Sequence, residues 1–386
     1  MKTLKVLLVI ALLSVNCMYG QNDQNKLAKV SLNYSKYGLK AGSIPEKWED
    51  GMRTNGEGGT YEWWYFDAHL EDGSTAVIVF FTKPVMDIKK GLTPFVTIDI
   101  DRPDGTKIQK KYYGKAGSFS GSKDSCNVVI GHNYFRGNLE KYEIHFEDDE
   151  LNIDVNVQRT TESWRPQTGQ MVFGKDEADY FAWVVAVPQG KTNIDYTYKG
   201  NNVNLNGSCY HDHNWGNQSI ANLFNHWYWA RAEIGPYNVV ASEMISEKKF
   251  NKDNIVVFNV SKEGKTIVDD GAKVKMYQTY GKMHPALQKD VSNDLVFIYD
   301  SPSDGCRYEV YFFNEKNIIE QDLLSMSITD KFKLRVARMI SGFDGAYFRM
   351  TGKAEIRVFK NNQLIETYTS PKAVWELMYP GKPNQK

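Results

Sequence analysis

The chain has 386 residues, of which 41% are hydrophobic, 24% charged and 13% aromatic. This length and composition allow a substantial hydrophobic core, and we expect two domains. Lysine plus arginine equal aspartate plus glutamate at 47 each, with no long run of one sign. On electrostatic grounds, neither nucleic acid nor an anionic membrane is expected as a partner.

Residues 1–20 are typical of a secretory signal. A basic start precedes the short apolar run 6–15, and Gly20 offers a small residue for cleavage. Cys17 raises the alternative of a lipid anchor, but Asn16 is a poor match to the small residue that lipoprotein processing requires. We therefore expect export, periplasmic or secreted, after cleavage near Gly20. No later segment is long and apolar enough for a transmembrane helix, which predicts a soluble mature protein.

Alternation with a period of two residues dominates the rest of the chain. Segment 151–158 alternates apolar and polar residues, as expected for a half-buried strand, and it follows the similar segment 141–146 across an acidic turn, so the two predict a hairpin. Asp-Gly and similar turn pairs recur between such runs. Many short strands with tight turns and few helices predict an all-β barrel or sandwich.

Two segments carry helical signals. Segment 329–342 places Phe332, Val336 and Met339 on one face and ends at Gly342, which predicts a helix with a basic outer face. The other segment is 370–377, in which a serine can cap the helix and a proline follows in the first turn.

The stretch GTYEWWYFDAHLEDGS, residues 59–74, combines aromatic rings with acids on one strand. Successive side chains of a strand point to opposite faces, so each face receives one acid beside large rings. The two sets are Glu62, Trp64 and Phe66 on one face and Trp63, Tyr65 and Asp67 on the other. A core strand of a barrel and a functional wall are both compatible with this pattern.

The stretch GSCYHDHNWGNQS, residues 207–219, holds the densest set of titratable groups. In an extended chain His211, His213 and Trp215 face one way and Tyr210, Asp212 and Asn214 the other. A His-x-His pair can bind a metal, but the third ligand, such as His226 or Glu62, is not specified, and we expect no metal. The remaining alternatives are a hydrogen-bonded cluster at a domain junction and a catalytic role, which the mixture of groups favours.

Residues 224–243 again interleave aromatic rings with charged groups. We interpret Arg231 as a structural clasp, lying over a tryptophan and paired with an acid. The mature chain would keep Cys126, Cys209 and Cys306, widely spaced and without a CxxC motif, which allows one disulfide or three buried thiols.

The motifs YEWWYFDAHL, SCYHDHNWG and HWYWARAE, in this order, resemble the carotenoid 1,2-hydratase (hydroxyneurosporene synthase) and AttH-like family, to which kievitone hydratase and the fungal lipocalin-like Diels–Alderases are similar. The resemblance covers most of the mature chain. It implies two lipocalin-like antiparallel β-barrel domains packed together, an apolar pocket, and neither a metal nor an organic cofactor. It also implies reactions that range from hydration of isoprenoid double bonds to ring closure of polyenes, so it indicates the fold better than the reaction.

Within this resemblance, the His-x-Trp pair of the carotenoid hydratases matches His213 and Trp215. Their Tyr-x-Asp pair has no clean counterpart, because Tyr237 is the nearest tyrosine and Val239 stands where the acid would be. This departure puts carotenoid hydration itself in doubt.

We therefore predict a domain at residues 45–220 and a second at 221–386, which together hold a hydrophobic isoprenoid, carotenoid-like or polyketide-like molecule. As an enzyme, the protein would be a cofactor-independent hydratase, isomerase or cyclase. Its candidate catalytic residues are His213, Asp212 and Glu62, and its candidate substrate-binding residues are Trp215, Trp64, Trp227, Tyr237 and His211. The competing hypothesis is a carrier without chemistry. A protonated acid in the pocket would favour the enzyme, and an apolar pocket whose acids are ion-paired would favour the carrier.

Overall fold

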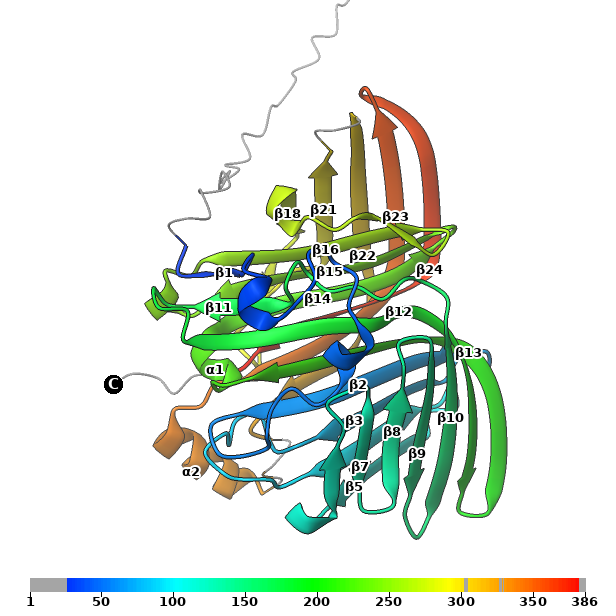
Figure 1. Cartoon of the computed structure of the whole chain (residues 1–386), viewed down its shortest axis with the longest axis vertical. Coiled ribbons are helices and arrows are strands. Elements are labelled where there is room, and N and C mark those ends of the chain that lie inside the picture. Colours follow the sequence, from blue (N-terminus) through cyan, green and yellow to red (C-terminus); the bar gives the residue numbers. More distant parts are fainter. Residues whose placement is uncertain (1–25, 302–304, 326–327, 329, 382–386) are drawn as a thin grey trace, which may run out of the picture.

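The computed structural model describes residues 26–301, 305–325, 328 and 330–381 (Figure 1). The predicted signal segment, residues 1–20, lies outside the described residues. Nearly all of the regular structure is antiparallel β-strand, so the predicted all-β fold class is confirmed.

One curled sheet is built from the first half of the chain. Eleven of its strands follow the order β5-β4-β3-β2-β13-β12-β10-β9-β8-β7-β6, and β11 pairs with β12 and with β1. The strands are β1 (Ala28–Val30), β2 (Tyr61–Leu70), β3 (Thr75–Phe81), β4 (Phe95–Asp101), β5 (Lys107–Tyr113), β6 (Phe119–Gly121), β7 (Asn127–Ile130), β8 (Asn133–Gly137), β9 (Lys141–Glu147), β10 (Leu151–Arg159), β11 (Gln170–Phe173), β12 (Asp179–Tyr198) and β13 (Asn201–Gly216).

A second curled sheet follows, in the order β17-β16-β15-β14-β24-β23-β22-β21-β18. Its strands are β14 (Phe224–Ile234), β15 (Tyr237–Ser246), β16 (Asn254–Lys262), β17 (Lys265–Val268), β18 (Val274–Thr279), β21 (Asp294–Asp300), β22 (Cys306–Asp322), β23 (Ala346–Lys360) and β24 (Gln363–Tyr379). The short strands β19 (Lys282–Met283) and β20 (Asp290–Val291) pair only with each other.

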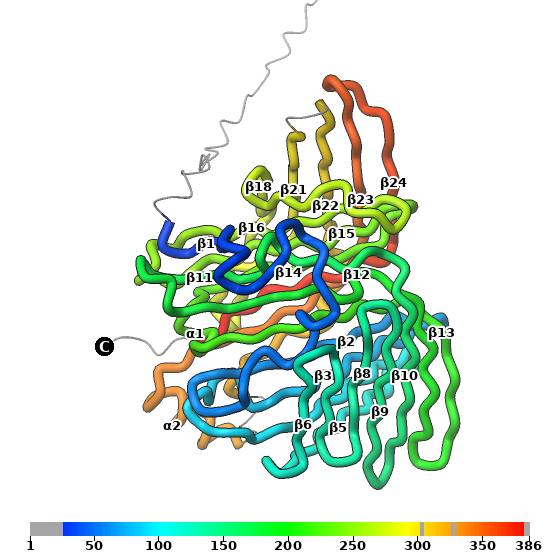
Figure 2. Tube along the Cα trace, viewed as in Figure 1, coloured from blue at the N-terminus to red at the C-terminus, as the bar shows by residue number. Residues whose placement is uncertain are grey.

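The chain trace shows the two curled sheets lying against each other (Figure 2). Each sheet encloses its own apolar core, and a third apolar cluster joins the two sheets. That third cluster draws side chains from β2, β11, β12 and β13 of the first sheet and from β14, β15, β16 and β24 of the second. The chain changes sheet between Gly216 and Phe224, with the short helix α1 (Ile220–Leu223) in between. The division into folding domains at residue 220 stays a prediction.

The predicted hairpin of residues 141–158 is confirmed, because β9 and β10 pair in antiparallel register. The predicted helix at 329–342 is confirmed as α2 (Lys331–Ser341), which is followed by Gly342 in the left-handed region at φ 62°. In the described part of the chain no helix is long and apolar enough to cross a membrane.

The helix predicted for residues 370–377 is wrong, because this segment belongs to β24. Its alternate residues Ala373, Trp375 and Leu377 are buried in the second core, as the period of a strand requires. The register shifts between Ser370 and Ala373, and such an irregularity accommodates Pro371, which cannot donate a ladder hydrogen bond.

Candidate active site between the two sheets

The two sequence motifs lie on neighbouring strands of the first sheet. Strand β2 pairs with β13 so that Trp64 is opposite His213 and Tyr65 is opposite Asp212. Because side chains alternate, the pair presents one set of motif residues to the core of the first sheet and the alternate set to the second sheet.

On the core side, His213 and Glu62 form a fully buried pair. The Nε2 atom of His213 lies 2.7 Å from Oε1 of Glu62, and both side chains have zero exposure. The imidazole ring lies between two indoles, stacked on Trp64 at 4.6 Å and tilted against Trp215 at 4.8 Å between centroids. Glu62 also accepts hydrogen bonds from the backbone N–H and the hydroxyl of Thr54. These contacts bind the segment that precedes β2 to the sheet.

Asp50 extends this cluster, and sequence reasoning did not find it. Its carboxylate accepts a 2.5 Å hydrogen bond from the Tyr142 hydroxyl, lies 3.3 Å from Nε2 of His211, and is 3.6 Å from Nδ1 of His213. Burial lowers the pKa of His211, but the charge and hydrogen bond of Asp50 outweigh this and raise that pKa overall. Asp50 follows no recognisable motif and reaches the cluster only through the tertiary fold.

The same cluster contains the donor atoms that could hold a metal ion. One ligand atom each from Asp50, Cys126 and His211 lies within 4.8 Å of the others, and all three residues are buried. His211 is oriented for this by Nδ1, which lies 2.8 Å from the Tyr65 carbonyl oxygen. The third-ligand candidates named from the sequence, His226 and Glu62, are not in this group. That the protein needs no metal stays a prediction, which elemental analysis of purified protein would test.

We expect replacement of His213 by alanine to destabilise the protein strongly. The substitution leaves the Glu62 carboxylate buried without its imidazole partner and opens a cavity between two indoles, so the free energy of unfolding should fall by about 3–5 kcal/mol. Urea denaturation monitored by circular dichroism measures this. A loss below about 1 kcal/mol would contradict the structural role, since that is the usual effect of a surface substitution.

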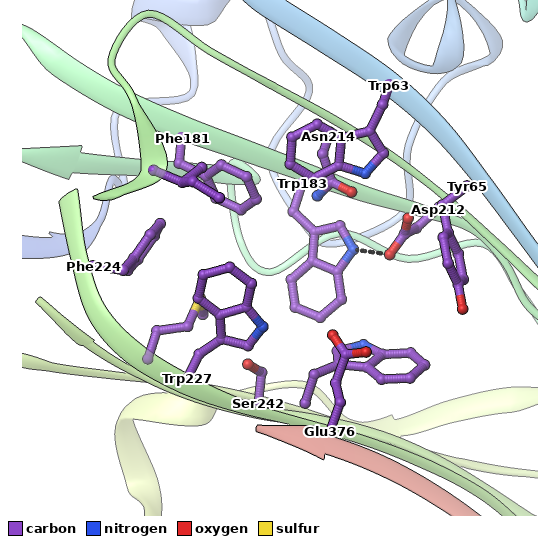
Figure 3. A pocket seen from close by; sticks show the side chains of 13 residues that line it. Trp63, Tyr65, Phe181, Trp183, Asp212, Asn214, Phe224, Trp227, Ser242 and Glu376 are labelled. Atoms are coloured by element: carbon purple, nitrogen blue, oxygen red, sulfur yellow. Dashed lines mark hydrogen bonds between the residues drawn. The ribbon is translucent and has the colours of Figure 1, made fainter. Parts of the chain in front are cut away.

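The opposite face of β2 and β13 forms one wall of a pocket between the two sheets (Figure 3). The cavity has a volume of about 120 Å³. Strands β2, β12 and β13 supply the first wall, and α1, β14, β15 and β24 supply the second. The lining residues are Trp63, Tyr65, Phe181, Trp183, Asp212, Asn214, Ile220, Phe224, Trp227, Trp229, Ser242, Met244 and Glu376. Aromatic walls with a few polar groups are typical of a small-molecule site.

Asp212 is the acid of the first wall. Its Oδ2 atom accepts a hydrogen bond of 2.8 Å from Nε1 of Trp183, which Figure 3 draws, and another of 2.8 Å from the hydroxyl of Tyr210. Burial raises the pKa of Asp212 to about 7, although the two hydrogen bonds and His211 oppose the shift. Because Trp183 and Tyr210 both donate to Oδ2, a proton carried by the carboxyl group belongs on Oδ1. Asp212 can therefore act as a proton donor near neutral pH.

The second wall contributes another carboxyl group and an unpaired donor. Glu376 accepts a 2.7 Å hydrogen bond from the Tyr347 hydroxyl, and burial raises its pKa. In Figure 3 the Glu376 side chain comes from the wall opposite Asp212. Trp229 is 8% exposed, and its Nε1 atom has no hydrogen-bond partner among the described residues. A buried N–H on a pocket wall favours a ligand with an oxygen acceptor.

A buried ion pair joins the two sheets beside the pocket. Arg231 of β14 donates to both carboxylate oxygens of Asp67 of β2, and its guanidinium lies 5.6 Å from the centre of the Tyr210 ring. Arg231 is thus a clasp with an acid partner, as the sequence predicted, although its ring is a tyrosine and not a tryptophan. Tyr210 connects the clasp to Asp212.

The predicted site residues divide between three places. Asp212 and Trp227 line the pocket, whereas Tyr237 donates a hydrogen bond to Glu366 and packs in the second core. The others lie on the core side of β2 and β13, away from the pocket, and these are Glu62, Trp64, His211, His213 and Trp215.

Trp183, Trp229 and Glu376 line the pocket but were missed, together with Trp63 and Tyr65, which were noted only as facing the other way. Alternation could have found Trp63 and Tyr65, since Asp212 lies on the same face as these two residues in the paired strands.

Residues 54–280, more than half of the chain, match the model of the Diels-Alderase-like family. The chain belongs to this family. The matched segment includes both motif strands and β14, and therefore most of the pocket wall. It ends before β24, so Glu376 lies outside it.

Among solved structures, the chain is similar in fold to an AttH protein from Nitrosomonas europaea, with a TM-score of 0.57 and 12% identity over 88% of this chain and 97% of that one. It is also similar to CghA bound to Sch210972, with a TM-score of 0.57 and 11% identity over 93% and 99%. Kievitone hydratase from Nectria haematococca gives a TM-score of 0.51 and 15% identity over 87% and 93%. These likenesses support the AttH-like fold that the motifs predicted.

One curated relative is similar in sequence over a short segment. The quinolone epoxide rearrangement protein penF from Penicillium thymicola is 33% identical over 55 residues. The match spans 14% of this chain and 15% of the length of that protein.

Proposed function

We propose that the protein is a cofactor-independent enzyme that acts on a hydrophobic, unsaturated small molecule in the pocket between the sheets, with Asp212 as the general acid. The observation that carries the proposal is a carboxyl group of raised pKa, about 7, in an aromatic pocket. A carrier needs no such group, and no residue that the structure describes forms an ion pair with this acid. Membership of the Diels-Alderase-like family supports the enzyme as well.

The chemistry follows from the surroundings of Asp212. Proton transfer from Oδ1 to an alkene carbon forms a C–H bond and leaves a carbocation, whose charge the faces of Trp63, Trp183 and Trp227 stabilise. Water can then add to the cation and return a proton to the Asp212 carboxylate, which completes a hydration. Capture of the cation by a second double bond of the same molecule gives a cyclisation, with loss of a proton to the same carboxylate.

The substrate class follows from the walls and the unpaired donor. We expect an isoprenoid, polyene or polyketide-like molecule with an oxygen acceptor for Nε1 of Trp229. The printed names of the relatives fit acid-assisted chemistry on such molecules, since they include a hydratase and an epoxide rearrangement protein. Export of the protein, predicted from residues 1–20, belongs to the same proposal.

The test compares small molecules from the source organism before and after incubation with purified protein. Wild-type protein should convert a hydrophobic compound that Asp212→Asn protein leaves unchanged. A product heavier by one water identifies a hydratase, and a product of unchanged mass identifies an isomerase or cyclase. If both proteins return the same co-purified compound unchanged, the protein is a carrier.

Replacement of Trp227 by alanine should weaken binding of the substrate more than it weakens the fold. The indole lines the pocket and is only partly buried, so its removal costs contacts with the ligand and little core packing. We expect at least a tenfold loss of affinity for a polyene probe such as parinaric acid, corresponding to about 1.4 kcal/mol. Fluorescence titration measures this. An unchanged affinity would show that the probe binds outside this pocket.

A further inference from the structure

We infer that α2 is a docking helix for an anionic lipid surface, and that it holds the enzyme with the pocket end of the second sheet towards the membrane. Binding to lipid is independent of the chemistry at Asp212. Only the consequence that substrate enters from the lipid rests on the proposed function.

The first observation is an apolar face without a protein partner. Among the exposed large apolar side chains, four belong to this 11-residue helix, with exposures of 76% for Phe332, 37% for Val336, 69% for Met339 and 80% for Ile340. In helical projection the four lie within one arc of about 100°. No residue of α2 is buried in the described structure. A contiguous apolar patch of this kind marks a surface that meets another apolar phase.

The second observation is the charge that borders this face. Helix α2 carries Lys331, Lys333, Arg335 and Arg338 and no acidic residue. Arg338 forms an ion pair with Asp322 of β22, and the other three basic residues have no ion-pair partner among the described residues. Basic residues beside an exposed apolar face are the pattern of a helix that lies in the plane of an anionic membrane surface. The balanced charge of the whole chain conceals this local concentration.

The third observation is that the helix is well formed without that surface. The side chain of Asp330 caps its first turn through a 2.7 Å hydrogen bond from the backbone N–H of Lys333. The backbone N–H of Gly342 donates to the Arg338 carbonyl at its end. The apolar face is therefore exposed in the absence of lipid, and the free energy of docking is not reduced by the cost of folding the helix.

The position of α2 connects docking with the pocket. The helix lies between the end of β22 and the start of β23, where Asp322 pairs with Ala346. In the next row along the sheet, Tyr347 pairs with Met378, which pairs with the pocket residue Trp227. In the view of Figure 1, α2 lies on the same side of the molecule as α1, whose Ile220 also lines the pocket.

The proposal is tested by flotation of the full mature chain with vesicles of phosphatidylcholine alone or mixed with phosphatidylglycerol. We expect binding to the mixed vesicles that high salt weakens. The variant Phe332→Ser/Met339→Ser/Ile340→Ser should lose more than about tenfold in partitioning, because the apolar contact is removed. Lys333→Gln/Arg335→Gln should lose about fivefold for each charge.

The matched control is Leu364→Ser/Ile365→Ser, which removes two equally apolar side chains, 53% and 52% exposed, from the β23–β24 hairpin. It should bind vesicles like wild type, and so should Asp212→Asn, which separates docking from chemistry. Equal binding of wild type and the triple serine variant overturns the proposal. The proposal is also overturned if the wild type is a dimer and the triple serine variant is a monomer, because α2 would then be a protein interface.

Discussion

Replacement of Asp212 by asparagine is expected to reduce turnover by about a hundredfold to ten-thousandfold, the usual contribution of a general acid. Asparagine keeps the shape of the side chain and an oxygen that accepts from Trp183 and Tyr210, but it has no acidic proton to transfer. In the wild type, kcat/KM should fall as the pH rises through about 7, the pKa of Asp212. A wild-type kcat/KM that does not fall through this pH range, or an Asp212→Asn variant that keeps both its turnover and the same pH dependence, would remove Asp212 from the acid role.

The same substitution should stabilise the protein at alkaline pH. The pKa of Asp212 is about 7 in the folded state and about 3.9 in an unfolded chain, so between these values the folded state holds the proton and the unfolded state does not. Wild-type stability therefore falls as pH rises from about 4 to about 7, and Asp212→Asn avoids that loss. The gain should be near zero at pH 4 and at most about 4 kcal/mol at pH 8. The exposed Asp195→Asn on β12 is the control and should change neither property.

Loss of one partner of the Asp67–Arg231 ion pair is expected to destabilise the protein by about 3–5 kcal/mol, because the remaining charge stays buried. Asp67 and Arg231 are 1% and 5% exposed, and they join the two sheets. The control pair, Lys265 with Glu162, also links the two halves, but Lys265 is 75% exposed, and Lys265→Ala should cost less than about 1 kcal/mol. Urea denaturation compares the variants.

Two further measurements separate the clasp from a general packing effect. The double variant Asp67→Leu/Arg231→Met should recover most of the lost stability, since no charge is left without a partner. Asp67→Ala should also move the fall in activity to lower pH, because the negative charge of Asp67 contributes to the raised pKa of Asp212. A double variant as unstable as the single ones would show that shape, and not charge, holds the sheets together at this point.

The all-β architecture could be predicted because alternation is a local property. Segments 141–146 and 151–158 carry it clearly and form a hairpin in the structure. The error at residues 370–377 has a local cause too, since a serine followed by a proline fits the start of a helix. The burial of Trp375 against the second core overrides that signal, and the bulge beside Pro371 removes its cost.

The site could be predicted only in part, because alternation tells which side chains share a face but not what each face meets. His213 and Glu62, both named as candidate catalytic residues, form a buried pair, yet their face is the core of the first sheet, and the pocket lies behind them. Asp212 was named as a candidate because its carboxyl group can act as an acid. Glu376 lies 164 residues after Asp212 in the chain, and nothing in the surrounding sequence distinguishes it.

The use of both faces of β2 and β13 has a consequence for engineering. Positions 63, 65, 212 and 214 touch the pocket, while positions 62, 64, 211 and 213 hold the buried cluster. A combinatorial library confined to positions 63, 65 and 214, which keeps the general acid Asp212, would reshape the cavity without changing any residue of the buried cluster. Mutagenesis can therefore search for new substrates on two strands whose alternate residues keep the same backbone in place.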